Sequence, residues 1–199
     1  MIAVCKRFLA TSALILSVAA LAAGQNLSHT SPEGWSTDGG FNNLKWGMGP
    51  ADVRGIFPKL MFMERKGPVG GYLAEDFVEG MRVHVHCRFY KGRLYRVRLI
   101  ASRFGTTSSD DVGLEEWKAR EKTWVNRLKP ILQEKYGDPT EDTYGYAPAW
   151  TWHRGRTSVQ LISSPAAAVS YADVAVANEA DAAQEASRTA EEKARRSRL

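Results

Sequence analysis

The stretch RVHVHCRFYKGRLYRVRLIA, residues 82–101, decides the fold, because apolar and polar side chains alternate along it on both sides of Lys91-Gly92. Alternation with a period of two is typical of β-strands that bury one face. We therefore predict an antiparallel hairpin of strands 82–89 and 93–101. Its core face carries the odd-numbered residues Val83, Val85, Cys87, Phe89, Tyr95, Val97, Leu99 and Ala101.

The same alternation predicts the turn between the two strands. Residues directly opposite each other in an antiparallel pair point to the same face, so odd positions should lie opposite odd positions. A two-residue loop would place Phe89 opposite Leu94 and break this match. We therefore predict a three-residue loop at residues 90–92 with Gly92 left-handed, which pairs Cys87 with Tyr95. Cys87 then lies in the core and serves packing rather than reactivity.

Similar signals continue along the chain. Further strands are predicted at residues 60–64, 72–78, 141–146, 149–153, 157–163 and 167–174, with a loop at 67–71. A short helix begins at Pro50, and a long helix ends near residue 136, with Pro130 either kinking its last turn or starting a second short helix. The order helix, meander, helix, meander predicts a single α+β domain. Its halves, residues 44–103 and 104–174, share one antiparallel sheet.

Both ends of the chain differ from this domain. Residues 1–24, MIAVCKRFLATSALILSVAALAAG, combine Lys6 and Arg7 with an apolar run and small residues, the pattern of a secretory signal peptide. A retained membrane anchor is the alternative, although the run falls short of the ~20 apolar residues that a span needs. Residues 25–43 are predicted to be a flexible leader, and residues 175–199 a charged helical tail without an apolar stripe. We expect a periplasmic or secreted protein with no stable transmembrane span after cleavage.

The composition excludes several classes of protein. The 199 residues are 44% hydrophobic and 25% charged, as in ordinary globular proteins, and two cysteines do not make a disulfide scaffold. The sequence contains no GxSxG, HExxH or Walker A motif. We therefore predict that the protein is not an enzyme and uses no cofactor.

The distribution of charge carries the functional prediction. Between Arg82 and Arg103 lie seven Lys and Arg residues and no Asp or Glu. The residues of this stretch predicted to share the face away from the core are Arg82, His84, His86, Arg88, Arg96 and Arg98. Because guanidinium groups suit carboxylates and phosphates, this basic face is predicted to bind an acidic protein surface or an anionic envelope component, and no nucleic acid is expected. Alternatively, acidic groups of the long helix or Glu75, Asp76 and Glu79 cover the face, or its charges only solvate the sheet and deter edge pairing.

Two smaller groups of residues allow other interpretations. His84 and His86 share one strand face, a spacing that can bind zinc or copper, and they support the alternative of a small metal-dependent or hydrolytic enzyme. The three-residue loop places two arginines opposite them, which disfavours a cation, so no metal site is predicted. Trp150 and Trp152 share a face of their own strand, where they either bind a ligand or pack in the core.

Short motifs resemble those of a group of small exported bacterial proteins. They are Trp46-Gly47-Met48 before a short helix, Gly92-Arg93 in a hairpin, Tyr136-Gly137-Asp138-Pro139 at a helix end, and a Trp-containing strand before a charged C-terminal helix. More distantly, the two helix–meander halves resemble the β-lactamase-inhibitor-protein type of fold and the small lipoprotein of the outer-membrane β-barrel assembly machine. This resemblance implies protein binding without catalytic residues. Gln25 stands where a lipoprotein would carry its lipidated cysteine, so the role of that lipoprotein is not implied.

Overall fold

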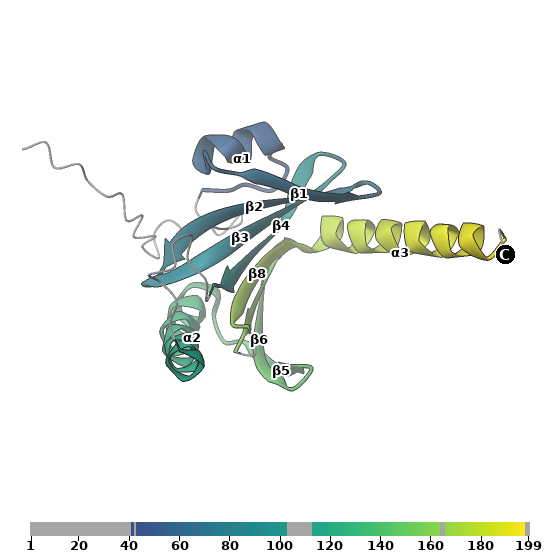
Figure 1. Ribbon diagram of the computed structural model, residues 1–199. Coiled ribbons are helices and arrows are strands. Elements are labelled where there is room, and N and C mark those ends of the chain that lie inside the picture. Colours follow the sequence, from purple (N-terminus) through teal and green to yellow (C-terminus); the bar gives the residue numbers. More distant parts are fainter. Residues whose placement is uncertain (1–40, 42, 103–112, 164–165, 198–199) are drawn as a thin grey trace, which may run out of the picture.

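The computed structural model describes residues 41, 43–102, 113–163 and 166–197 (Figure 1). The elements are α1 (Pro50–Ile56), β1 (Met61–Lys66), β2 (Val69–Val78), β3 (Met81–Tyr90), β4 (Arg93–Ala101), α2 (Leu114–Tyr136), β5 (Thr140–Tyr144), β6 (Ala147–Arg154), β7 (Thr157–Ile162), β8 (Ala168–Asp173) and α3 (Val174–Arg196). The predicted signal peptide at residues 1–24 lies outside the described residues.

The eight strands form one antiparallel sheet in the order β1-β2-β3-β4-β8-β7-β6-β5. Each half of the chain contributes a helix followed by a four-strand meander: α1 with β1 to β4, and α2 with β5 to β8. The halves meet where β4 pairs with β8, which sets Val97 opposite Tyr171 and Leu99 opposite Val169. The predicted α+β fold, two helix–meander halves sharing one sheet and a C-terminal helix, is confirmed.

The main core lies between the sheet and the helices α1 and α2. Alternate strand residues such as Val85 and Val159 are fully buried in one cluster with Trp124 and Leu128 of α2. The indole Nε1 of Trp124 donates to the carbonyl oxygen of Val78 at 2.8 Å, which ties α2 to the end of β2. We call this side of the sheet the core face. The opposite side is the outer face, where α3 lies (Figure 1).

The turns are tighter than the sequence predicts. Tyr90 pairs with Arg93 around a two-residue loop in which Lys91 has φ 50° and Gly92 has φ 77°. Two left-handed residues make a type I′ turn, whose twist matches that of the strands it joins. The predicted three-residue loop is therefore wrong. The predicted loop at residues 67–71 is likewise only the turn between β1 and β2.

A β-bulge resolves the mismatch that led to the three-residue loop. Phe89 pairs with Leu94, as a two-residue loop requires, and Tyr95 is the extra residue of the bulge. Beyond the bulge, odd positions again lie opposite odd positions, with Cys87 opposite Val97 instead of Tyr95. The extra residue also turns Tyr95 away from the predicted core-face row and onto the outer face.

Tyr95 explains why the C-terminal tail is a docked helix. It forms a small buried cluster with Tyr90 and Val69 of the sheet and Ala177 and Ala180 of α3. The tail, predicted to lack a stripe that could hold it down, therefore packs through alanines, because the bulge supplies an aromatic ring to receive them. Farther along, α3 is largely exposed and extends away from the body of the molecule (Figure 1).

The domain also begins earlier than the sequence predicts. Phe41 is fully buried, and the centre of its ring lies 6.5 Å from that of Tyr171. The predicted leader, residues 25–43, therefore includes a core residue. Residues 25–40 lie outside the described residues. Pro130, where a kink was predicted, lies within the single helix α2.

Candidate functional site

Four side chains form a compact group on the outer face. The register of β3 and β4 places Arg88 opposite Arg96 and His86 opposite Arg98. Opposite residues have Cβ atoms about 4.5–5.5 Å apart, and same-face neighbours along a strand are about 7 Å apart, so the four form a compact group that we call the basic quartet. The predicted face is correct. The predicted partners are wrong, because the bulge shifts the pairing by two residues and leaves His84 outside the quartet.

Two arginines of the quartet have carboxylate partners from other elements. Arg88 Nη2 lies 3.5 Å from Oε1 of Glu64 on β1, and Arg96 Nη2 donates to Oδ2 of Asp181 on α3 at 2.9 Å. Among the described residues, no carboxylate lies within ion-pair distance of Arg98. Acidic cover, the alternative proposed from the sequence, thus reaches Arg88 and Arg96 through Glu64 and Asp181. Of the acids that the sequence suggested, Glu75 lies 3.6 Å from His84 Nε2 on the same face.

His86 carries a shifted pKa because of its place in the quartet. Burial lowers the pKa of His86 below 6.5, and the nearby His84, Arg98 and Arg88 lower it further. The lowered pKa favours the uncharged imidazole at neutral pH, so His86 adds little positive charge to the quartet. An anion beside Arg98 would favour the imidazolium form, because an opposite charge stabilises the charged state.

Small polar side chains continue the outer face from Arg98 onto the second half of the sheet. Ser170 on β8, Gln160 on β7 and Thr151 on β6 follow Arg98 in one row across the strands. All three are half-buried, and their hydroxyl and amide groups can donate hydrogen bonds. The sequence alone does not reveal this row, because the row depends on the register between β4 and β8, two segments distant in the chain. The alternating polar positions Ser158, Gln160 and Ser170 are the signal that could have found it.

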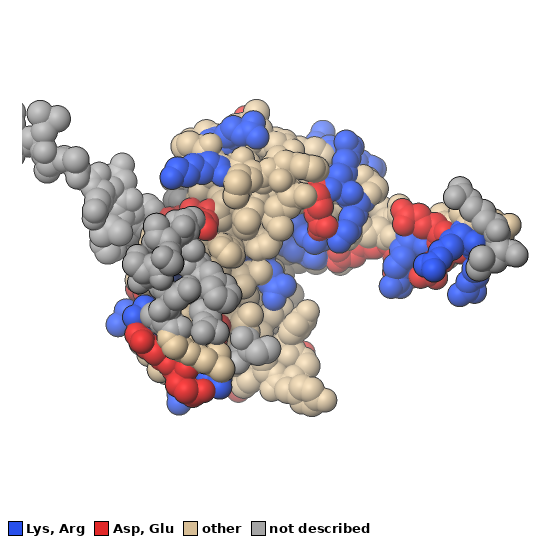
Figure 2. Space-filling view, viewed as in Figure 1, with Lys and Arg blue, Asp and Glu red and all other residues tan. Residues whose placement is uncertain are grey.

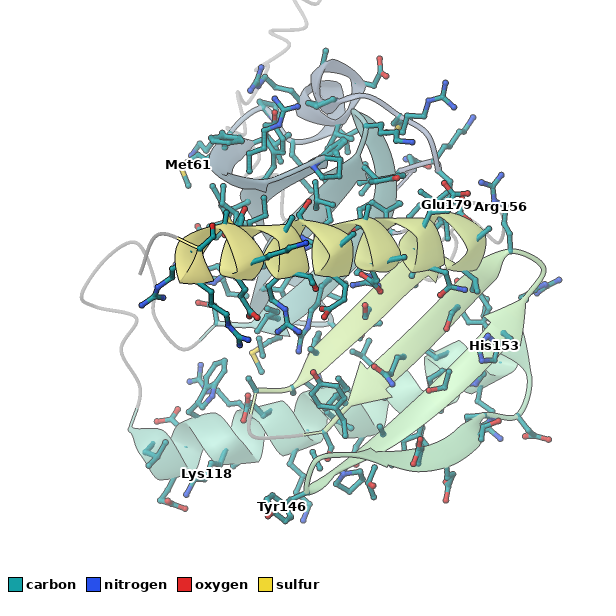
Figure 3. The ribbon with its side chains drawn as sticks, turned by 90° about the vertical axis from the view of Figure 1, so that its right-hand side faces the viewer. Met61, Lys118, Tyr146, His153, Arg156 and Glu179 are labelled. Carbon is teal, nitrogen blue, oxygen red and sulfur yellow. The ribbon has the colours of Figure 1, made fainter. Side chains whose placement is uncertain are left out.

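The outer face is hollowed where α3 stands out from the sheet. In Figure 2, Lys and Arg side chains gather at the hairpin turns beside the start of α3, and a hollow separates α3 from the β5 end of the molecule. Figure 3 looks onto the outer face and shows α3 in front of the sheet, with α2 behind it. With 23 residues at about 1.5 Å per residue, α3 is about 35 Å long. A partner must therefore reach the outer face beside α3.

His84 and Arg82, the remaining predicted residues of this face, make contacts outside the quartet. His84 Nε2 lies 3.1 Å from Ser102 Oγ and 3.6 Å from Glu75 Oε1. A catalytic triad needs the serine and the carboxylate on different ring nitrogens, whereas here both approach Nε2. The guanidinium carbon of Arg82 lies 5.4 Å from the ring centre of Phe77. In the part of the chain that the structure describes, no three His, Cys, Asp or Glu side chains form a group that could hold a metal ion.

The two tryptophans of the predicted site lie on the core face. Trp152 is 1% exposed, and its Nε1 donates to the carbonyl oxygen of Gly137 at 2.8 Å. Trp150 is half-buried and donates to Oε1 of Glu141 at 2.9 Å, while Lys129 Nζ lies 4.4 Å from the centre of its ring. The sheet therefore separates both tryptophans from the basic quartet.

Cys87 has the structural position that the sequence predicts. It is fully buried on the core face, and burial raises the pKa of its thiol to about 12. The thiolate is the reactive form of cysteine, and at neutral pH almost none is present. Cys87 therefore contributes packing and no chemistry.

Comparison with known proteins assigns no function to the basic quartet, so its function is inferred from its own residues. No family model, curated protein or solved structure matches the chain. The helices that the structure describes include none that is long and apolar enough to cross a membrane.

Proposed function

We propose that this is an exported, non-catalytic binding protein that recognises an acidic segment of a protein partner through the outer face of its sheet. The proposal rests on Arg98. This guanidinium is half-buried near the centre of the sheet, and no carboxylate among the described residues pairs with it. A ligand carboxylate supplies the missing partner, and a guanidinium can bind it through two parallel hydrogen bonds.

The neighbours of Arg98 favour an extended peptide chain. Ser170, Gln160 and Thr151 continue its row over the next three strands. Adjacent strands lie about 4.8 Å apart, so the row spans about 14 Å. An extended chain advances about 3.3–3.6 Å per residue, so about four residues fit with one acidic side chain at Arg98. The hydroxyl and amide groups are suited to hydrogen-bond the peptide groups of that chain.

The shape of the outer face favours a peptide over a membrane surface. Because α3 stands in front of the sheet, a flat bilayer would meet α3 before it reached the quartet (Figure 3). An extended segment can enter the hollow beside α3 (Figure 2). Export is supported by the signal-peptide pattern of residues 1–24. The resemblance to folds whose members bind proteins also agrees with a binding role.

Binding to a fluorescently labelled oligoglutamate peptide tests the proposal by anisotropy. We expect affinity that falls steeply with added salt, because attraction between exposed charges is screened. Replacing Arg96→Gln and Arg98→Gln together should weaken binding by about tenfold or more. The matched control is Arg120→Gln with Arg127→Gln, which removes the same charge from exposed positions on α2.

Three results would overturn the proposal. The first is peptide binding that is insensitive to salt. The second is an equal loss of affinity in the two double variants, which would mean that only total charge matters. The third is tight binding to vesicles of anionic lipid with no measurable affinity for the peptide, which would assign the face to an envelope surface.

A further inference from the structure

Two strands close the sheet at opposite edges. Among the described residues, no strand pairs with the outward side of β1 or of β5. In Figure 3 the labelled Met61 of β1 and Tyr146, just after β5, mark opposite ends of the molecule. An open edge presents unpaired backbone N–H and C=O groups that can pair with a strand of another chain.

The side chains of the two edges are complementary in their order along the strands. Strand β1 begins with the exposed apolar residues Met61, Phe62 and Met63 and ends with the exposed cations Arg65 and Lys66. Strand β5 has the reverse order. Near its start, after Thr140, are the exposed acids Glu141 and Asp142; it ends at the exposed Tyr144, and the exposed Tyr146 follows.

We propose that copies of this chain associate head to tail, with β1 of one copy pairing antiparallel with β5 of the next. Antiparallel alignment brings the basic end of β1 to the acidic end of β5. It also brings the apolar start of β1 close to Tyr144, at the end of β5, and to Tyr146 just after it, where methionine sulfur and aromatic rings attract each other. The inference is independent of the proposed peptide binding and concerns a different surface.

The register of the sheet identifies a specific pair of residues across this contact. Lys66 lies opposite Val69, which lies opposite Tyr90, so Lys66 is on the outer face. Asp142 lies opposite Ala149, which lies opposite Ile162, and it is on the same face. Opposite residues in an antiparallel pair share a face. Setting Lys66 opposite Asp142 therefore continues both faces of the sheet from copy to copy.

Pairing of like edges fits the side chains less well. Two antiparallel β1 strands would set the apolar end of each against the cations of the other. Two β5 strands would set acids against tyrosines. Within one copy Lys66 pairs with Glu64 at 2.8 Å. Exposed pairs of this kind contribute little to stability, so this contact does not prevent Lys66 from pairing with Asp142 of another copy.

Sedimentation velocity of the purified protein over a range of concentrations tests the inference. We expect wild-type protein to form species that grow with concentration, because contact between two different edges does not close. Lys66→Glu alone and Asp142→Lys alone should each weaken association about tenfold, since each sets like charges opposite one another. An equimolar mixture of the two variants should associate again, because the introduced glutamate of one variant then meets the introduced lysine of the other. The matched control is Lys122→Glu on α2, which should associate as wild type does.

Wild-type protein that stays monomeric at every soluble concentration would overturn the inference. Association that Lys66→Glu and Asp142→Lys leave unchanged would also overturn it, because the contact would then lie elsewhere. So would a mixture of the two variants that associates no better than either alone.

Discussion

Arg88 lies directly opposite Arg96, and each is held by a carboxylate from a different element, Glu64 on β1 and Asp181 on α3. Like charges opposite each other destabilise a sheet by roughly 0.2–1 kcal/mol per pair, so Glu64 and Asp181 offset the destabilisation caused by the two opposed arginines. The other half of the quartet avoids the cost differently, because His86 opposite Arg98 has a lowered pKa. Within the quartet, Arg98 is then the one charge that no carboxylate of the described residues neutralises, and a ligand can do so.

Arg98 should therefore limit stability while supporting binding. We expect Arg98→Met, which keeps an unbranched apolar stem and removes the charge, to raise the free energy of unfolding by about 0.5 kcal/mol, since it removes a half-buried charge with which no described carboxylate pairs. The same change should weaken oligoglutamate binding. Urea denaturation and anisotropy measure the two effects. Arg93→Met on the same strand, at the exposed turn, is the control and should change neither. A destabilised Arg98→Met variant would show that the guanidinium serves the fold.

Asp181 occupies one corner of the site that the acidic ligand is proposed to use. Its pair with Arg96 is partly exposed, with side-chain exposures of 53% and 28%. Such pairs contribute at most about 1 kcal/mol, so a ligand carboxylate can displace Asp181. We expect Asp181→Asn to raise oligoglutamate affinity about two- to fivefold at low salt. Glu185→Gln, one turn farther along α3, removes the same charge and should have little effect. Equal gains in both variants would point to net charge alone.

The pKa of His86 predicts a loss of stability in mild acid. Its folded-state pKa lies below 6.5, through burial first and then through His84, Arg98 and Arg88. Below pH 6.5 the unfolded chain therefore binds more protons at this position than the folded chain. The contribution of the neutral His86 to the free energy of unfolding is fully present above pH 6.5, and it is lost as the pH falls through the folded-state pKa. Urea denaturation on both sides of pH 6.5 should give a smaller pH dependence for His86→Gln than for wild type. A His86→Gln curve parallel to wild type would contradict the assignment.

The sequence predicted the strands of the central hairpin but not the way they are joined. Alternation along residues 82–101 depends only on which side chains are buried, so it marks the faces well. Where an odd-numbered residue would lie opposite an even-numbered one, in contrast, either a longer loop or a β-bulge can restore the match. The bulge places Tyr95 beneath Ala177 and Ala180, and these residues lie far along the chain. The local sequence holds no signal for that contact.

The candidate site was predictable to a similar extent. Alternation correctly placed Arg88, Arg96 and Arg98 on one face. Which of them keeps an unpaired charge depends on Glu64 and Asp181, which reach the quartet only through the folded arrangement of β1 and α3. The polar row beside Arg98 depends on the pairing of β4 with β8, and that register joins two segments that are distant in sequence.

The tight turn between β3 and β4 leads to a test of the register itself. Lys91 has φ 50°, a left-handed conformation that costs most residues roughly 1–2 kcal/mol and that asparagine tolerates. Its Nζ also lies 4.9 Å from the centre of the Tyr90 ring, so any neutral replacement loses a cation–π contact. Comparing Lys91→Asn with Lys91→Gln removes this complication, because both lose the charge and only asparagine favours the left-handed position. We expect the Asn variant to be more stable than the Gln variant by about 0.5–1 kcal/mol in chemical denaturation. In the three-residue loop that the sequence predicts, only Gly92 is left-handed. With that loop, the two variants would have equal stability.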